Sequence, residues 1–282
     1  MADTAVVIAT RDRRETVLRT LRELDALPER PELVLVDDAS RDRTAAAVRD
    51  AFPRVRVLER AAPGGQSAGR NAGVRATDAR YVAFCDDDSW FEPGALALAV
   101  AAFERHPRLG AVAARVLVEP GGRLDLACEQ MAASPLGTVP ALGVPRVLGF
   151  VACGAVVRRT AFFGAGGFAE PYGGGGEEQL LAIDLTAAGW DVAYMPEVIA
   201  HHRPARGGRP GRPQMQLRND LWTAWLRRPR RAALRVSAGL LGSARPGVAA
   251  RALAEALAGL GWVLRARRIV SPQLERAISR LG

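Results

Sequence analysis

Three consecutive carboxylates, Asp86, Asp87 and Asp88, are the residues of this sequence best suited to chemistry. They directly follow a short apolar run over residues 81–85, which predicts a buried strand. Like charges crowded at a strand end repel one another, and a bound cation relieves that repulsion. Asp86 and Asp88 would point to the same side of a continuing strand, and their oxygens suit a hard divalent cation. A solvated acidic turn is the alternative interpretation.

The segments before this run predict the sheet that must position it. Residues 5–9 and 33–36 are short apolar runs typical of buried parallel strands, and residues 55–58 predict a third strand. Helical periodicity lies between them, over residues 17–24 and 44–50. This alternation predicts an open, largely parallel α/β sheet, in which ligands bind at the carboxyl ends of strands. Polar residues follow three of the predicted strands at that edge: Thr10, Arg11 and Asp12, then Asp37 and Asp38, then Asp86 to Asp88.

A glycine-rich segment over residues 63–73, PGGQSAGRNAG, predicts a loop that leads into a helix. We expect Arg70 and Asn71 on the first turn of that helix, where an arginine suits a diphosphate. A surface loop with a solvated arginine is the alternative.

Four segments, in this order and spacing, resemble the nucleotide-sugar domain of family 2 glycosyltransferases with the GT-A fold: VVIATRDR, ELVLVDDASRD, GGQSAGRNAGVRAT and YVAFCDDDSWFEPGAL. A later segment, GGGGEEQLLAIDLTAAGWDVAYMPEVIAHH, resembles the acceptor side of the same enzymes. The resemblance implies a catalytic domain over residues 1–205, followed by a basic, helical extension over residues 206–282. It also implies metal-dependent, inverting transfer of a sugar from a nucleoside-diphosphate sugar, such as a UDP- or dTDP-sugar.

The resemblance also implies roles at the donor site. Asp88 would bind Mg²⁺ or Mn²⁺ directly, and Asp86 would contact the ribose or a metal-bound water, with Asp87 in support. Asp38, with Asp37 beside it, resembles the acid that reads the edge of the nucleobase. The other implied donor-site residues are Thr10, Arg11, Asp12, Arg70 and Asn71.

A second acid pair, Glu177-Glu178, stands where the family carries its general base. We expect Glu178 to be the base and keep Glu177 as the second candidate. Acids in the first turn of a helix are also favoured by the helix dipole alone. The family often has an aspartate two residues after the pair, where this chain has Leu180, and this departure keeps an inactive homologue as an alternative. Asp184 is expected to be structural.

Four glycines over residues 173–176 precede this pair. They predict a loop that closes over the donor or a passive connector. The adjacent His201 and His202 follow a strand predicted over residues 191–195. The resemblance implies that His202 completes the metal site or touches the diphosphate, and a surface histidine pair is the alternative.

Charge divides the chain into two parts. Residues 1–200 contain 22 arginines and 27 acidic residues, whereas residues 201–282 contain 17 arginines and 3 acidic residues. The segment RPARGGRPGRPQ over residues 203–214 predicts a linker, and helices are predicted over residues 218–231 and 248–264. The second of these helices would carry a leucine stripe, Leu253, Leu257, Leu260 and Leu264. Such helices either lie on an anionic membrane or pack on the catalytic domain with solvated arginines.

Cysteine usage and the N-terminal sequence bear on location. Cys85, Cys128 and Cys153 fit no zinc pattern and no disulfide framework, which favours a reducing cytoplasm. We expect no signal peptide and no spanning helix, and therefore a cytoplasmic protein that can sit at the inner face of the membrane.

Two other classes are less consistent with the sequence. A nucleotidyltransferase would show a glycine-rich basic signature after the first strand, where this chain has TRDRRE. A nucleic-acid binder would not place a carboxylate-lined edge against phosphate, so no nucleic-acid partner is expected. The acceptor, whether glycan, lipid-linked, protein or natural product, is not identified by the sequence.

Overall fold

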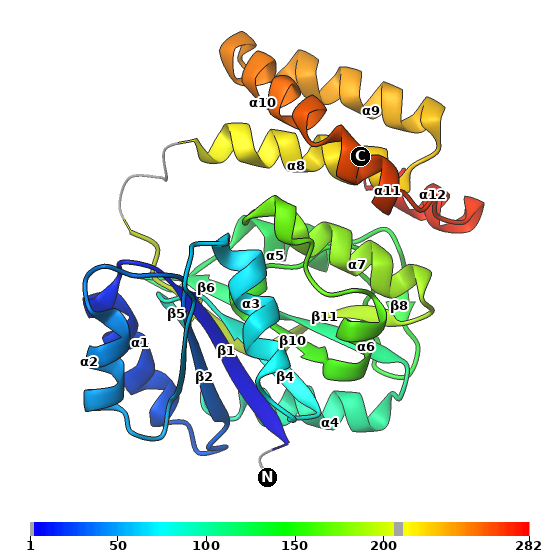
Figure 1. Cartoon of the computed structure of the whole chain (residues 1–282). Coiled ribbons are helices and arrows are strands. Elements are labelled where there is room, and N and C mark those ends of the chain that lie inside the picture. Colours follow the sequence, from blue (N-terminus) through cyan, green and yellow to red (C-terminus); the bar gives the residue numbers. More distant parts are fainter. Residues whose placement is uncertain (1–2, 206–210, 282) are drawn as a thin grey trace.

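The computed structural model describes residues 3–205 and 211–281 (Figure 1). Strands and helices alternate through the first third of the chain, as the apolar runs and helical periodicities predicted. The elements are β1 (Thr4–Thr10), α1 (Arg14–Asp25), β2 (Glu32–Asp37), α2 (Thr44–Ala51), β3 (Arg56–Glu59), α3 (Gly65–Arg75), β4 (Tyr81–Cys85), β5 (Ser89–Phe91) and α4 (Ala95–Arg105).

The middle of the chain adds longer strands and three helices. The elements are β6 (Leu109–Val118), β7 (Arg123–Leu124), α5 (Leu126–Ala132), β8 (Thr138–Val139), β9 (Val144–Pro145), β10 (Ala155–Arg158), α6 (Arg159–Gly164), α7 (Glu177–Ala187) and β11 (Asp191–His202). Two short 3₁₀ turns, η1 (Ala152–Gly154) and η2 (Glu170–Tyr172), precede β10 and the glycine loop.

One mixed sheet organises these elements. Its strand order is β3-β2-β1-β4-β10-β6-β11-β5, with β7 paired to β6. The strands β3, β2, β1 and β4 are parallel, β10 is antiparallel to both of its neighbours, and β11 runs parallel to β6. Because β10 is antiparallel to both β4 and β6, these two strands run in the same direction, and β11 runs with them. The carboxyl ends of β1, β2, β4 and β11 therefore lie at the same edge, which confirms the predicted largely parallel α/β sheet.

Helices cover both faces of the sheet. Leu21 of α1, Val48 of α2 and Phe103 of α4 belong to the apolar core on one face. Val74 of α3 and Leu181 of α7 belong to the core on the other face. The strands between them are buried on both sides, which explains why β1 and β2 read as continuous apolar runs instead of alternating ones.

The C-terminal region forms a separate helical layer, which Figure 1 shows beyond α5 and α7. Trp222 of this layer packs with Tyr172 near the glycine loop, and Arg227 pairs with Asp184 on α7. The expected structural role of Asp184 is thus explained by an ion pair. The layer consists of α8 (Arg212–Arg227), α9 (Arg230–Ser243), α10 (Pro246–Ala258), α11 (Leu260–Ala266) and α12 (Pro272–Ile278).

Two predictions for this region need correction. The helix predicted over residues 218–231 ends at Arg227, because Pro229 starts a new helix. The single helix predicted over residues 248–264 is two helices bent by 60°. The bend lies at Gly259, where a Cβ atom would come within 2.5 Å of the Trp222 ring, so glycine allows this close approach.

The predicted leucine stripe does not form the packed face of these helices. Leu257, Leu260 and Leu264 are exposed, whereas Ala252 and Val263 are buried. Among the described residues no single helix has the length and apolar character to cross a bilayer, although α10 and α11 together pass that test as a bent pair. The predicted linker over residues 203–214 lies partly outside the described residues, and the domain boundary at residue 205 stays a prediction.

Candidate active site

The carboxyl edge of the sheet brings together the polar residues that follow the strands. A cavity of about 290 Å³ opens there. It is lined by the last residues of β1, by residues that follow β1, β2 and β4, and by the first residues of α3: Ala9, Thr10, Arg11, Arg13, Asp38, Gly65, Gln66 and Asp87. The structure thus places Thr10, Arg11, Asp38 and Asp87 together. Asp12 lies in an adjacent surface depression, where its carboxylate accepts a hydrogen bond from the backbone of Arg41.

Arg13 neutralises two of the three consecutive carboxylates. Its Nε atom lies 2.8 Å from Asp87, and its Nη2 atom lies 2.7 Å from Asp88. Thr10 donates a further hydrogen bond to Asp87 over 2.8 Å. Burial raises the pKa of Asp87 to about 6, although Arg13 and Thr10 act in the opposite direction. Sequence reasoning missed Arg13, although crowded acids at a strand end require a nearby cation and this arginine follows β1 by only three residues.

His202 comes from the end of β11 and faces Asp88, with 3.3 Å between Nε2 and the carboxylate. Burial disfavours its protonation, but the hydrogen bond and charge of Asp88 outweigh burial, so the pKa of His202 is raised. Ligand atoms of His202, Asp86 and Cys153 lie within 4.8 Å of one another. Burial raises the pKa of the Cys153 thiol well above its ordinary value, so this sulfur is a neutral neighbour at physiological pH.

The donor set fits a divalent cation. The imidazole of His202 neighbours both carboxylates, since Nε2 lies 3.3 Å from Asp88 and a ring nitrogen lies within 4.8 Å of an oxygen of Asp86. Carboxylate oxygens suit Mg²⁺ and Mn²⁺. His201 points elsewhere, because adjacent residues of a strand face opposite sides. Its two ring nitrogens lie 3.0 Å from Glu92 and Glu119, and its ring stacks on Trp90.

Arg70 connects the donor side to the acid pair of α7. It lies in the middle of α3 and not on its first turn, because the helix already begins at Gly65. Its guanidinium lies 2.6 Å from Asp86 and 2.7 Å from Glu177, and both Arg70 and Glu177 are buried. Burial and the neighbouring Glu178 raise the pKa of Glu177, although Arg70 opposes that change.

Glu178 is less enclosed than its neighbour. It is half-buried, and its carboxylate accepts a hydrogen bond from the backbone of Gly176 over 3.1 Å. Glu177 is wholly buried and binds Arg70 through Oε1, so Glu178 is the member of the pair whose carboxylate is accessible to a substrate.

Three predicted donor-site residues instead hold the backbone. Asp37 accepts hydrogen bonds from the backbone of Ser40 and Ala45 and so fixes the loop into α2. Asn71 is buried and both ends of its amide bind the backbone of Phe168, so it does not face the cavity, contrary to prediction. Asp38 lines the cavity, but its carboxylate also accepts from the backbone of Gly64 and Gly65 and pairs with Arg60.

The four glycines are held by α8. The side-chain nitrogen of Asn219 lies 3.2 Å from the carbonyl oxygens of Tyr172 and Gly174 and 2.6 Å from that of Gly175. Gly175 and Gly176 have positive φ, and a Cβ on either would meet Gln216 at 2.9 Å. The segment is thus a turn that α8 holds and that sets the start of α7, not a passive connector, and its closure over the donor stays a prediction.

Similarity to known proteins agrees with this geometry. Residues 5–163 match the family described as "Glycosyl transferase family 2". An N-acetylglucosaminyl-diphospho-decaprenol L-rhamnosyltransferase of Mycobacterium tuberculosis is 27% identical over 268 residues, covering 79% of this chain and 86% of the relative.

Solved structures show the same fold. The mannosyltransferase PcManGT of Pyrobaculum calidifontis, in complex with GDP-Man and Mn²⁺, superposes with a TM-score of 0.62 at 22% identity, covering 99% of this chain and 74% of that one. TarS of S. aureus, in complex with UDP-GlcNAc, has a TM-score of 0.61 at 17% identity, covering 78% and 65%. These likenesses confirm the GT-A fold. Since the family match covers more than half of the chain, the protein belongs to glycosyltransferase family 2 and is a glycosyltransferase.

Proposed function

We propose that this enzyme transfers a sugar from a nucleoside-diphosphate sugar to an acceptor hydroxyl, with inversion at the anomeric carbon. The observation that carries the proposal is the buried Arg70, which binds Asp86 on the donor side and Glu177 on α7. This bridge fixes the donor carboxylates relative to the helix that carries Glu178. A donor site and a base held in one rigid unit are what a direct displacement needs.

The donor side would use a divalent cation, Mg²⁺ or Mn²⁺, held by Asp88 and Asp86 with His202 beside them. Such a cation would neutralise the charge that grows on the leaving diphosphate. Arg13 both pairs with Asp88 and lines the donor cavity, so it can exchange a carboxylate for a phosphate oxygen as the donor binds. Thr10, Asp38 and Arg11 would contact the nucleoside in the same cavity.

On the acceptor side Glu178 acts as the general base. The acceptor oxygen forms a bond to the anomeric carbon while the bond from that carbon to the diphosphate oxygen breaks. The acceptor proton passes to the Glu178 carboxylate, and the nucleoside diphosphate leaves. Glu177 supports this step by anchoring the first turn of α7 to Arg70.

We infer a UDP- or dTDP-sugar as the donor, by family resemblance. TarS is described in complex with UDP-GlcNAc, in line with this inference, and PcManGT with GDP-Man, so a GDP-sugar is the alternative to compare. The mycobacterial relative is named for a diphospho-decaprenol acceptor, which supports a lipid-linked acceptor for this protein.

A lipid-linked acceptor agrees with the surface of the C-terminal layer. Leu257 and Leu264 on α10 and α11 are 53% and 63% exposed, and Leu234 on α9 is 71% exposed. The exposed arginines Arg265 and Arg268 lie close to these leucines in sequence, and residues 201–282 carry an excess of 14 positive charges. Exposed leucines beside arginines suit the surface of an anionic bilayer. We propose that the protein is cytoplasmic and lies peripheral to the inner face of a membrane.

Metal-dependent donor binding tests the proposal. UDP, dTDP and GDP are titrated calorimetrically into the parent protein and into Asp88→Ala, each with Mn²⁺ and with a chelator. The parent should bind one nucleotide at least tenfold more tightly with Mn²⁺, and Asp88→Ala should lose that difference. Asp78→Asn, which changes an exposed acid elsewhere, is the matched control. Equal affinity with metal and with chelator in the parent would refute the metal role.

A further inference from the structure

Two adjoining cavities lie along α7, apart from the donor cavity. One, of about 500 Å³, is lined by Met131, Phe150 and Gln179 among others. The other, of about 640 Å³, is lined by residues of α12 and of the amino-terminal edge of the sheet. Leu148 and Arg280 line both cavities, so the two adjoin, and we call the pair the groove beside α7. Neither cavity holds any of the predicted donor-site residues.

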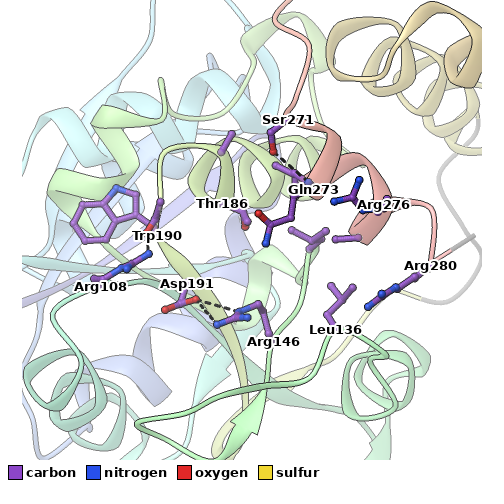
Figure 2. A pocket seen from close by; sticks show the side chains of 15 residues that line it. Arg108, Leu136, Arg146, Thr186, Trp190, Asp191, Ser271, Gln273, Arg276 and Arg280 are labelled. Carbon is purple, nitrogen blue, oxygen red and sulfur yellow. Dashed lines mark hydrogen bonds and ion pairs between the residues drawn. The ribbon is translucent and has the colours of Figure 1, made fainter.

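The larger cavity is strongly basic (Figure 2). Figure 2 shows Arg108 and Arg146 on one side of it and Arg276 and Arg280 on the other. Its single acidic residue, Asp191, is already paired with Arg146 over 2.9 Å and with His106 over 2.8 Å. With Arg146 paired to Asp191, the other three arginines leave a net positive potential that favours an anion.

The arginines come from distant parts of the chain. Arg108 precedes β6 and Arg146 follows β9, whereas the other two lie on and just after α12. Arg228 holds α12 in place, because its Nε and Nη2 atoms donate to Oε1 of Glu275 over 3.0 and 2.9 Å. The cavity therefore forms only when the C-terminal helix docks on the catalytic part.

The geometry of α7 relates this cavity to the reaction. Gln179, which lines the smaller cavity, directly follows the proposed base Glu178. Thr186 and Ala187, near the other end of the same helix, line the basic cavity. Eight residues separate Glu178 from Thr186, and a rise of 1.5 Å per residue puts them about 12 Å apart along the axis.

We propose that this groove binds the acceptor and that the basic cavity binds a phosphate or diphosphate group of it, about 12 Å from the reacting hydroxyl. The smaller cavity presents the apolar faces of Met131 and Phe150 beside the amides of Gln130 and Gln179, a surface that suits sugar rings. The acceptor class is thus a phosphorylated glycan, either lipid-linked or soluble. This inference rests on the proposed function, because it takes Glu178 as the base.

A charge-matched pair of double variants tests the subsite. Arg276→Gln with Arg280→Gln removes two arginines of the cavity, and Arg245→Gln with Arg251→Gln removes two exposed arginines of the same helical layer. Each full-length protein is titrated with inorganic diphosphate in a chelator, where the carboxylate-lined donor site has little affinity for anions. The cavity variant should bind diphosphate about 10- to 100-fold more weakly than the parent, and the control variant should not. Equal affinity in both double variants would overturn the subsite.

Two further measurements distinguish a lipid-borne from a soluble anion, and failure of the anion subsite from failure of the proposed function. The first is flotation with vesicles that contain phosphatidic acid, with and without diphosphate. If the subsite takes a lipid-borne phosphate, diphosphate should displace the protein from the vesicles. If it takes a soluble phosphoglycan, diphosphate should bind without changing flotation. Either pattern supports the subsite, provided that diphosphate binding depends on the cavity arginines. Affinity for the donor nucleotide with Mn²⁺ should be the same in all three proteins. If the parent shows no such affinity, the proposed function fails, whatever the diphosphate result.

Discussion

The α/β part and the C-terminal helical layer place their charges in opposite ways. In the α/β part the buried charges are paired: Arg70 binds Glu177, and Asp87 and Asp88 both bind Arg13. In the helical layer most arginines are exposed, and large apolar side chains such as Leu264 are exposed with them. Buried charges are costly and persist where they are paired and do chemistry. Exposed leucines beside arginines suit an interface.

The helix α8 does not fit this division. It belongs by sequence to the basic layer, yet Asn219 and Gln216 shape the turn from which α7 starts. The division predicted at residue 205 therefore separates two segments that together position the proposed base. The helices α9 to α12 are farther from the acids and form the surface proposed for the membrane and for the anion of the acceptor.

The largest effect is expected at the proposed base. Glu178→Gln keeps the shape of the side chain and loses its basicity, so turnover should fall about 10²- to 10⁴-fold. Nucleotide affinity should stay within about twofold of the parent, because Glu178 lies outside the donor cavity. Turnover is measured with an identified acceptor and affinity by calorimetry. Full turnover in Glu178→Gln with an inactive Glu177→Gln would move the role to Glu177, and full turnover in both variants would refute the base assignment and point to a retaining mechanism.

The next largest effect is expected on stability, when a buried and an exposed arginine of α3 are each replaced by methionine. Arg70→Met leaves Asp86 and Glu177 without their shared cation, so the free energy of unfolding should fall by about 3–5 kcal/mol. Arg75→Met removes an exposed ion pair with Glu170, so the loss should be about 0–1 kcal/mol. Urea unfolding measures both. Similar losses in the two variants would mean that Arg70 has no special structural role.

The fold was largely predictable because its signals are local. Apolar runs such as residues 5–9 and 33–36 indicate strands buried on both faces, and the acids that follow them indicate the binding edge. Arg13, Cys153 and Asn219 were missed because their roles depend on contacts between segments far apart in sequence. Asn71 looked like a donor ligand for the same reason, since its partner Phe168 lies 97 residues away.

The exposed leucine stripe shows a different limit of the sequence. Helical spacing identifies an apolar face, but it does not tell whether protein or membrane covers that face. Here small residues, Ala252 and Ala256, face the neighbouring helices, and the leucines face outward. The bend at Gly259 was also hidden, because its cause is the Trp222 ring of another helix.

A smaller effect is expected from the link between the two regions. Asn219→Ala removes the donor that three carbonyls of the glycine turn share, so the first turn of α7 should shift. A displacement of about 1 Å at a catalytic group can cost up to 100-fold in rate, and we expect turnover to fall about 10- to 100-fold. Donor affinity should change little. Ser243→Ala, at an exposed position of α9, is the control. Parental turnover in Asn219→Ala would show that the turn keeps its shape without α8.

The smallest effect concerns the exposed leucines. Leu257, Leu260 and Leu264 are each replaced by serine in one protein, with Leu98→Ser and Leu126→Ser as a control on exposed leucines of the α/β part. Partial burial of three leucines in a bilayer surface contributes a few kcal/mol at most, so binding to anionic vesicles should weaken roughly 10-fold. Electrostatic attraction from the arginines remains, which is why the effect is modest and why high salt should remove the residual binding. Transfer to a water-soluble acceptor should proceed at the parental rate, because none of the three leucines lines the donor cavity or the groove beside α7. If the triple variant and the control bind vesicles equally well, the leucines are not the membrane contact, and the basic layer holds the protein at the surface by charge alone.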